Sequence, residues 1–342
     1  MNTVNHPISK ASSFKWLLKR EYWENRGGFL YAPVIAGGIS LVMSLLGIVF
    51  GLVAMHRAVK SGGLHLNDEN VSINGLDLSL LTSKLDAKNL HDLANGLDLT
   101  LILSSGWPLI VLAFVVFFYC LGALYDDRRD RSILFWKSLP LSDTSTVLSK
   151  AVSALLIAPL IAVIASALTM FGFLVMISIV VIAHGGDPML LIWGPASPLT
   201  ILAGHLSWIP VYLLWALPTV GWLLLCSAWA KTKPFLWAVM LPLFAGIIVS
   251  TTKVMTLFDL TGGWFWKHIV GRLLLSAVPA TDQFYRGESM FSGNGNMDNL
   301  VNELGPSHQL ATFAMPELWI GAAVGVVFLF LAIRLRRRAG EI

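Results

Sequence analysis

Charged residues are scarce in this chain: Asp, Glu, Lys and Arg make up 13% of its 342 residues, against about 25% in soluble domains. This deficit excludes a disordered chain and most soluble enzymes. A net charge of only +4 also excludes a protein that binds nucleic acid through a broad basic face. Hydrophobic residues take the place of charge, at 56% of the total, and they gather in long uncharged runs. We therefore expect a polytopic membrane protein.

Cysteines and catalytic motifs are scarce too. Only Cys120 and Cys226 occur, and both fall inside apolar runs, so we expect buried thiols and no disulfide between loops. The sequence contains no phosphate-binding P-loop, no H-E-x-x-H, no G-x-S-x-G and no C-x-x-C. We expect a chain that is not an enzyme and that holds no cofactor or metal ion of its own.

Six uncharged apolar runs are long enough to cross a membrane as helices. A hydrocarbon core of about 30 Å requires about 20 helical residues at a rise of about 1.5 Å each. The predicted spans are 29–55, 107–125, 151–183, 207–230, 235–252 and 318–333, within a transmembrane domain of residues 29–334. Glycines at GxxxG spacing, Gly47–Gly51 and Gly321–Gly325, are expected to allow close packing, and prolines such as Pro218 are expected to kink the spans.

The distribution of Lys and Arg predicts the orientation, because these residues concentrate in the cytoplasmic segments of membrane proteins. With both termini inside, the inner segments hold 16 of the 24 cations and seven of the 20 acids, a net charge of +9. The outer segments hold the rest, a net charge of −5. The outer loops are then 56–106, 184–206 and 253–317, the inner loop is 126–150, and 335–342 is a basic cytoplasmic tail. We expect the chain in a bacterial cytoplasmic (inner) membrane.

The N-terminal segment, residues 1–28, is predicted to contain an interfacial helix rather than a cleavable signal peptide. One face of the stretch 14–24 is apolar, interrupted by Glu21, and is formed by Phe14, Leu17, Leu18 and Tyr22. Trp16 and Trp23 lie near the opposite face as interface anchors. We expect this helix to lie in the inner headgroup layer; a solvated helix is the alternative.

The apolar segment 264–279 is a second helix expected outside the six spans. It is only 16 residues long and contains two cations, and as a span it would reverse the charge distribution described above. It is predicted to lie on the outer side between spans five and six, either re-entrant or flat on the surface. Its distinctive residues are Trp264, Phe265, Trp266, Lys267 and Arg272.

The inner loop 126–150 is the most unusual segment, because mixed charges at its start lead into an apolar cluster and then into a proline break. Ser142 or Asp143 is expected to cap a helix that runs through Lys150 into the third span. Such a loop either rests on lipid or forms a short helix that docks another protein, with aromatic anchors and a charged rim. The docking candidates are Asp127, Arg128, Arg129, Arg131, Ile133, Phe135, Trp136, Leu139 and Pro140.

At this loop the chain resembles the permease subunits of type-2 ABC exporters. Their pattern of an acidic–basic pair, a short helix, a proline break and a Lys before the third span is similar to Asp127-Arg128, residues 138–142 and Lys150. The stretch 19–26 is similar to the family's interfacial connecting helix. The span count, the cytoplasmic ends and the broken apolar segment after span five also agree. The loops 56–106 and 253–317 are longer than a minimal family member needs.

The resemblance implies a permease subunit without catalysis of its own. Two such chains, identical or different, would form the translocation pathway in the lipid bilayer, and each would dock a separate ATPase subunit that binds ATP and Mg. The loop 126–150 would transmit closure of the ATPase subunits to the spans, and the segment 264–279 would sit at the outer gate. Nucleic acid is not an implied partner.

Two other functions are compatible with the sequence. A membrane scaffold or assembly factor without transport is the main alternative, and a secondary carrier is the other. Carriers normally place ionisable side chains near the middle of the membrane, whereas the six apolar runs contain no Asp, Glu, Lys or Arg. An obligate P-loop partner would distinguish the exporter from both alternatives.

Replacement of both Phe135 and Trp136 by Ala tests the docking interpretation of the loop. If these side chains anchor a partner, the double variant should still insert into the membrane but should bind that partner more weakly by about 2 kcal/mol or more. The affinity would be measured on detergent-extracted protein. An unchanged affinity would favour an apolar cluster that only rests on lipid.

Overall fold

The computed structural model describes residues 10–60, 87–130, 142–252, 255, 262–286 and 305–338. These segments are almost entirely helical and contain no strand. Six of their helices are long and apolar enough to cross a membrane. The expectations of an all-α chain and of six helices that could cross a membrane are confirmed for the described segments.

The helices are best followed in chain order. The longer ones are α1 (Lys10–Glu24), α2 (Ala32–Lys60), α4 (Ala87–Ala123), α7 (Asp143–Val152), α8 (Ala158–Ala183), α9 (Pro198–Trp215), α10 (Leu217–Trp229), α11 (Pro234–Thr252) and α17 (Pro316–Arg338). The short ones are α5 (Tyr125–Arg129), α12 (Gly262–Phe265), α13 (Arg272–Leu275), α14 (Gln283–Arg286), α16 (Pro306–Ala311) and the 3₁₀ turn η6 (Thr312–Ala314). Segments of π-helix are η1 (Gly27–Tyr31), η2 (Ser153–Ile157), η3 (Met189–Trp193) and η5 (Trp266–Gly271).

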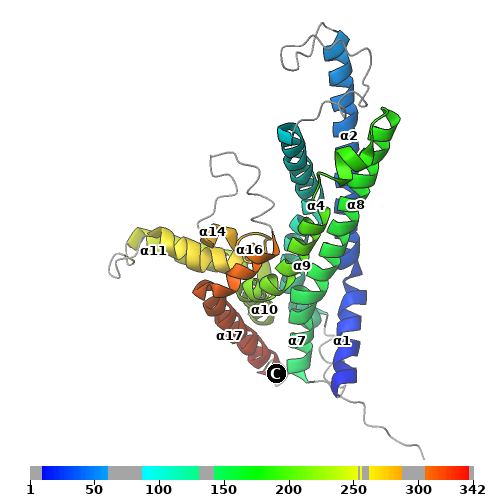
Figure 1. Ribbon diagram of the computed structural model, residues 1–342. Helices are drawn as coiled ribbons and strands as arrows, with labels where there is room; N and C mark the ends of the chain where they lie inside the picture. The colour runs from blue at the N-terminus through cyan, green and yellow to red at the C-terminus, as the bar shows by residue number, and fades with distance from the viewer. Residues whose placement is uncertain are drawn as a thin grey trace, which may run out of the picture.

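Helices α2, α4 and α8 pack side by side, and α10 joins α4 to α17 (Figure 1). At one end of this bundle, the lower end in Figure 1, α1 packs against α7, and the C-terminal part of α17 packs against α7 as well. We call this the charged end. Helix α11, drawn in yellow, runs away from the rest of the bundle and leaves most of its apolar surface exposed.

Helix α1 stands almost in line with α2 (Figure 1). Helical hydrogen bonds continue across their junction, from the Asn25 N–H to the Glu21 carbonyl at 3.1 Å and from the Phe29 N–H to the Asn25 carbonyl at 2.9 Å. The chain therefore does not turn sharply between α1 and α2. Helix α1 packs against α7 and has Leu17 and Glu21 buried.

Helix α4 begins at Ala87, well before the predicted span 107–125, so residues 87–106 of the predicted outer loop 56–106 are helical and continuous with that span. That prediction depended on uncharged runs, and Asp92 and Asp98 interrupt this one. The helix extends because Leu93, Leu97 and Leu101 share one face, along which Leu97 and Leu101 pack with residues of α8 and η3.

The predicted span 207–230 is instead part of a broken pair, α9 and α10, which meet at Ala216. Pro218 explains the break, because it has no N–H to donate and restricts the residue that precedes it. Helix α10 is shorter than a span, and ten of its 13 residues are buried. A helix that is apolar on every side belongs inside a protein, and α10 occupies the centre of the bundle.

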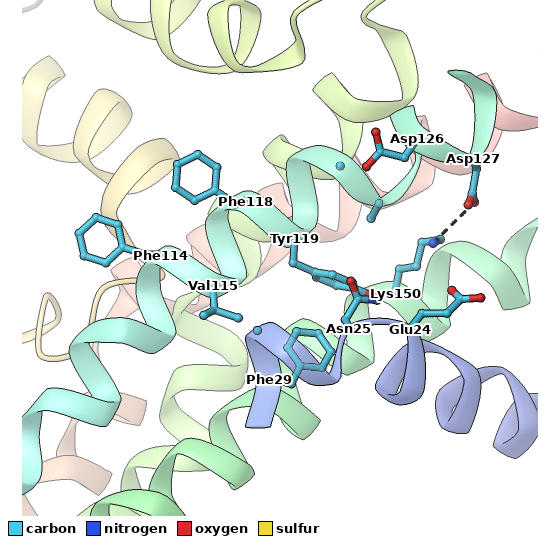
Figure 2. Close-up of a pocket in the computed structure, with 13 residues that line it drawn as sticks. Glu24, Asn25, Phe29, Phe114, Val115, Phe118, Tyr119, Asp126, Asp127 and Lys150 are labelled. Carbon is cyan, nitrogen blue, oxygen red and sulfur yellow. Dashed lines mark ion pairs between the residues drawn. The ribbon is translucent and has the colours of Figure 1, made fainter. Parts of the chain in front are cut away.

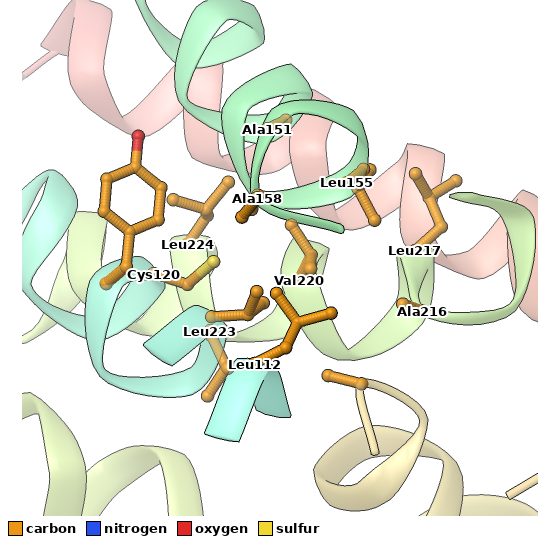
Figure 3. Packing of buried hydrophobic residues seen from close by; sticks show 14 of the residues in the cluster. Leu112, Cys120, Ala151, Leu155, Ala158, Ala216, Leu217, Val220, Leu223 and Leu224 are labelled. Carbon is orange, nitrogen blue, oxygen red and sulfur yellow. The ribbon is translucent and has the colours of Figure 1, made fainter. Parts of the chain in front are cut away.

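The main core surrounds α10 (Figure 3). Leu223 and Leu224 of α10 are completely buried among side chains of α4, such as Leu112, and small residues of the α7–α8 region, such as Ala158. Cys120 and Cys226 are both free and buried, as the sequence predicts.

Helices α10 and α17 approach so closely that their backbones touch at glycines. A Cβ atom added to Gly325 would lie 2.5 Å from the backbone carbonyl carbon of Leu217 and 2.7 Å from the nitrogen of Pro218. A Cβ added to Gly221 would lie 2.6 Å from the carbonyl oxygen of Gly325. The Gly321–Gly325 pair therefore serves packing within the chain, whereas a Cβ at Gly47 or Gly51 would meet nothing within 4 Å.

This contact predicts different effects for two glycine-to-alanine substitutions. Gly325→Ala should destabilise the protein by about 1–3 kcal/mol, because the added methyl group forces α17 away from α10. Gly51→Ala should be neutral or stabilising by up to about 1 kcal/mol, because it places a better helix former in open space. Thermal unfolding of both variants in one detergent measures the difference. Equal unfolding temperatures would contradict the close contact.

Candidate functional site

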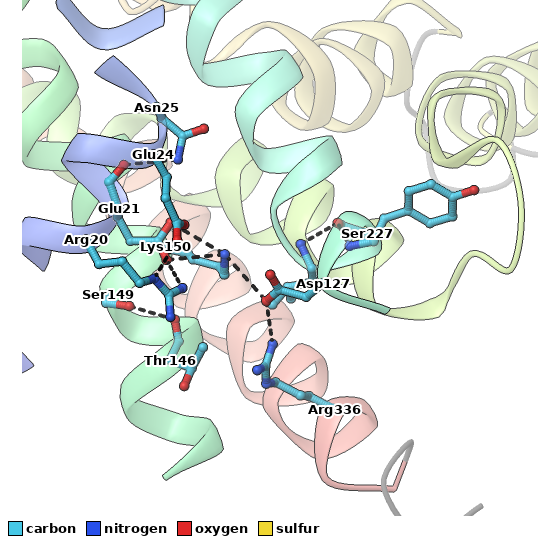
Figure 4. Close-up of polar contacts among 12 residues, drawn as sticks. Arg20, Glu21, Glu24, Asn25, Asp127, Thr146, Ser149, Lys150, Ser227 and Arg336 are labelled. Atoms are coloured by element: carbon cyan, nitrogen blue, oxygen red, sulfur yellow. Dashed lines mark hydrogen bonds and ion pairs between the residues drawn. The ribbon is translucent and has the colours of Figure 1, made fainter. Parts of the chain in front are cut away.

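Charged side chains from four helices meet at the charged end of the bundle (Figure 4). We call this group the charge cluster. Its members are Arg20, Glu21, Asp127, Asp143, Lys150 and Arg336. Three are acids and three are bases, and these ion pairs join them in alternation, while the half-exposed Glu24 pairs with Arg20 at the edge of the group. Buried charges are stabilised only when each has a partner, and the alternation satisfies this requirement.

Glu21 lies at the centre of the contact between α1, α4 and α7, and none of its surface is exposed. The Tyr119 hydroxyl of α4 donates a hydrogen bond to Oε2 at 2.8 Å. The Lys150 Nζ of α7 lies 3.3 Å from Oε1 and donates to Oε2 at 3.4 Å. Arg20 donates to Oε1 at 2.6 Å. One carboxylate thus holds together three helices that are far apart in the sequence.

Lys150 extends the cluster from α1 toward the C-terminus. Its ammonium lies 3.6 Å from Oδ2 of Asp127 in α5, and that same oxygen lies 3.2 Å from Nη1 of Arg336 in α17. The Nε of Arg336 donates to Asp143 in the first turn of α7 at 3.1 Å. Lys150 and Arg336 are only 3% and 4% exposed. The charge of each base is therefore neutralised by the cluster rather than by water.

Two members of the charge cluster, Asp143 and Arg336, lie at helix ends where the helix dipole stabilises their charges. Helix α7 starts after Ser142, whose side chain accepts the Ser145 N–H at 3.1 Å, so the predicted cap is confirmed. Asp143 then lies in the first turn of α7, and Arg336 in the last turn of α17. An acid near the start of a helix and a base near its end both interact favourably with the helix dipole.

Two π-helical segments come soon after Glu21 and Lys150 along the chain. Segment η1 begins at Gly27, after Glu21, and η2 begins at Ser153, after Lys150. A π-helix inserts an extra residue into the turn and changes which side chains face inward, and such segments occur frequently at functional sites. The backbone thus becomes π-helical six residues after Glu21 and three residues after Lys150.

Helix α5 is fixed to α10 by a separate set of hydrogen bonds. The Arg128 guanidinium donates to the carbonyl oxygens of Ser227 and Ala230, the latter at 2.8 Å. The Ser227 hydroxyl accepts the N–H groups of Leu124 and Tyr125 at 3.0 and 2.9 Å. The start of the inner loop is therefore attached to α10 as well as to α7 and α17.

A cavity of about 530 Å³ opens beside the charge cluster (Figure 2). One wall is polar and includes Glu24, Asp126 and Lys150, and the other is aromatic. Phe114 and Phe118 in the aromatic wall are 63% and 59% exposed, so the cavity continues into the apolar outer surface of α4. Burial raises the pKa of the Glu24 carboxyl above its usual value, while the nearby Arg20 acts in the opposite direction.

The structure brings together only part of the predicted coupling residues. Asp127 and Arg128 are in the contacts described above, whereas Arg129 is exposed. The others lie outside the described residues: Arg131, Ile133, Phe135, Trp136, Leu139 and Pro140. In α1, the predicted anchors Trp16 and Trp23 are 63% and 54% exposed, and Leu17 is buried. The partly exposed members of the predicted apolar face are Phe14, Leu18 and Tyr22.

The predicted gate segment folds against the junction of α9 and α10. Arg272 is only 6% exposed; its guanidinium lies 3.6 Å from the centre of the Trp215 ring and donates to the carbonyl oxygens of Trp215 and Glu317 at 3.3 and 3.2 Å. Burial lowers the pKa of Arg272 to about 10, which still leaves it charged at neutral pH. Arg272 thus connects α13 to α9 and to the start of α17.

The aromatic residues of this segment lie farther from α17. The Trp266 indole donates to the Ser250 hydroxyl of α11 at 2.8 Å, and the Trp264 ring stacks on His268 with 4.8 Å between centroids. The Lys267 ammonium lies 5.0 Å from the Tyr285 ring centre, and Phe265 is partly exposed. The five predicted gate residues therefore share one segment, which Trp266 connects to α11 and Arg272 connects to α9 and the start of α17.

Four residues of structural importance are missing from the sequence-based candidates. In the sequence Glu21 stands out only because it interrupts an apolar helix face, and this interruption was the one indication that it is buried with a partner. Tyr119 and Arg336 gave no signal, because their partners are remote in the sequence. Asp98 is 4% exposed within α4, where its carboxylate accepts the Ser197 N–H at 2.7 Å and so fixes the start of α9.

Comparison with known proteins identifies no relative: no protein-family model matches the chain, and neither a curated protein nor a solved structure is similar to it.

The charge cluster predicts that two glutamates of α1 differ in importance. Glu21→Gln should destabilise the protein by about 3 kcal/mol or more, because Lys150 and Arg20 lose a buried counter-charge. Glu24→Gln is the matched control: this side chain is half exposed and pairs with Arg20 at 3.4 Å, so its loss should cost less than about 1 kcal/mol. Thermal unfolding in detergent compares them. A smaller loss for Glu21→Gln than for Glu24→Gln would refute the assignment.

Proposed function

We propose that the chain is the membrane-spanning permease subunit of an ATP-driven ABC exporter of the type-2 class. In this proposal both termini and the charged end face the cytoplasm, a second permease chain completes the translocation pathway, and a separate ATPase subunit with bound ATP and Mg docks on the loop 126–150. The chain itself contributes no catalytic group. A bacterial cytoplasmic membrane is the proposed location.

The observation that carries the proposal is the attachment of both ends of the loop 126–150 to the charge cluster. Asp127 at its start pairs with Lys150 and Arg336, and Asp143 near its end pairs with the same Arg336. A displacement of the loop by a docked partner would therefore act on α1, α7 and α17 together. A subunit that converts ATPase closure into movement of its spans requires such a connection.

Charge distribution and span composition support the same assignment. The basic excess of the segments at the charged end agrees with a cytoplasmic location. The buried Asp98 and Arg272 are both held in hydrogen bonds to backbone groups, which is a structural use rather than the ion or proton pathway of a secondary carrier.

Purification of the tagged chain from its native host in mild detergent, with mass spectrometry of the proteins that accompany it, tests the proposal. We expect a stoichiometric soluble protein that contains a P-loop, and ATP hydrolysis by the complex that vanadate inhibits. Recovery of the chain alone in several detergents, without ATPase activity, would contradict the exporter and favour a scaffold. Transport that depends on an ion gradient would favour a carrier.

A further inference from the structure

A groove of about 600 Å³ lies on the surface between α1 and the π-helical segment η2. It is separate from the cavity beside the charge cluster, and the two share no lining residue. The groove is lined by Lys15, Trp16, Leu18, Lys19, Tyr22 and Ile157. This lining contains two cations and no acid, and the rest of it is apolar or aromatic.

The two lysines are free to bind an anion. Lys15 and Lys19 are four residues apart and so lie on one face of α1, and both are exposed. Within the described segments, no carboxylate forms an ion pair with either. The acids of α1 itself are occupied elsewhere, since Glu21 pairs with Lys150 and Arg20, and Glu24 pairs with Arg20. Lys19 Nζ is positioned 4.9 Å from the centre of the Trp16 ring.

The groove also lies where the apolar surface of the bundle begins. Beyond Ile157, exposed hydrophobic side chains continue along α8, from Leu160 through Leu168 to Ile182. The distance from Ile157 to Ile182 along a helix is about 38 Å, enough to cross a hydrocarbon core of about 30 Å. The lysines lie at the Ile157 end of this surface, because they line the same groove as Ile157, on the helix α1 at the charged end. Trp16 and Tyr22 are the residue types that prefer the boundary between lipid and water.

We propose that this groove binds the headgroup of an anionic phospholipid. The ammonium groups of Lys15 and Lys19 would contact the phosphate, while Leu18 and Ile157 would contact the first carbons of an acyl chain that continues along α8. A zwitterionic headgroup fits less well, because its amine would find no acid in the lining. A soluble acidic protein also fits less well, because most of the lining is apolar and continues into the exposed surface of α8.

A lipid in this position would stabilise the helix that carries Glu21. It would contact α1 through Lys15 and Lys19 and η2 through Ile157. Segment η2 directly follows α7, the helix that the Glu21–Lys150 pair joins to α1, so the lipid would reinforce the same contact. A ligand that binds only the folded state raises its stability. The proposal does not rest on an ATPase partner and holds equally for a scaffold or a carrier.

Native mass spectrometry of the purified chain, titrated separately with phosphatidylglycerol and phosphatidylcholine of the same acyl chains, tests the proposal. The wild type should bind phosphatidylglycerol more tightly, and each lysine removed should weaken that binding about fivefold. The test variant is Lys15→Gln with Lys19→Gln. The matched control is Lys231→Gln with Lys233→Gln, which removes the same charge from the exposed turn between α10 and α11.

Selective loss of phosphatidylglycerol binding in the test variant, with retention in the control variant, is the expected result. Equal affinity of the wild type for both lipids would overturn the proposal, as would equal losses in the two variants, which would indicate a general effect of charge. Inorganic phosphate added in excess distinguishes a free-anion site: if it displaces the lipid completely and the acyl chains add no affinity, the groove is not a lipid site. Phosphatidylglycerol should also raise the unfolding temperature of the wild type and of the control variant more than that of the test variant.

Discussion

The pairing of Glu21 with Lys150 is the interaction on which the charged end of this protein depends. Both side chains are almost completely buried, and isolated charges in such surroundings are strongly destabilising. Because Glu21 comes from α1 and Lys150 from α7, neither helix can leave the contact without exposing an unpaired charge to an apolar environment. Tyr119 of α4 donates to the same carboxylate and adds a third helix to this constraint.

The other contacts of the charged end extend from this pair. Lys150 also pairs with Asp127, and Asp127 pairs with Arg336, so the short helix α5 and the end of α17 are bound to the same cluster. On the far side of the bundle, Arg272 joins α9, α13 and the start of α17 through backbone carbonyls. Helix α17 is thus held at both ends by a buried arginine, Arg272 near its start and Arg336 near its end, and along its middle by the glycine contact with α10.

Much of the fold was predictable because apolar runs without charge have few structural options. The runs that became α2, α8, α11 and α17 were predicted within a few residues, apart from their polar ends. The start of α4 was not, since Asp92 and Asp98 interrupt its sequence although Leu97 and Leu101 are buried on one face of it. The break at Ala216 was indicated only as a kink at Pro218, because the sequence alone does not show that α10 lies inside the bundle.

The charge cluster was predictable only in part, for a physical reason. Lys150 and Asp127 stand out because they flank a span, and Ser142 stands out as a helix cap. Glu21 looks like a defect in an amphipathic helix until its three-dimensional partners are known, and Arg336 looks like one more residue of a basic tail. Pairing between residues more than one hundred positions apart leaves no local pattern, so the sequence neither marks Glu21 and Arg336 as members of such a cluster nor shows their contacts.

A double-mutant cycle between Asp127 and Arg336 tests most directly whether the loop and the last helix are energetically linked. The variants Asp127→Asn, Arg336→Gln and their combination would be unfolded thermally or with denaturant in one detergent. We expect a coupling energy of at least about 1 kcal/mol, because each single variant leaves a largely buried charge without one of its partners. Additive effects, with no coupling between the two positions, would contradict the claim that the loop is fixed to the spans through the charge cluster.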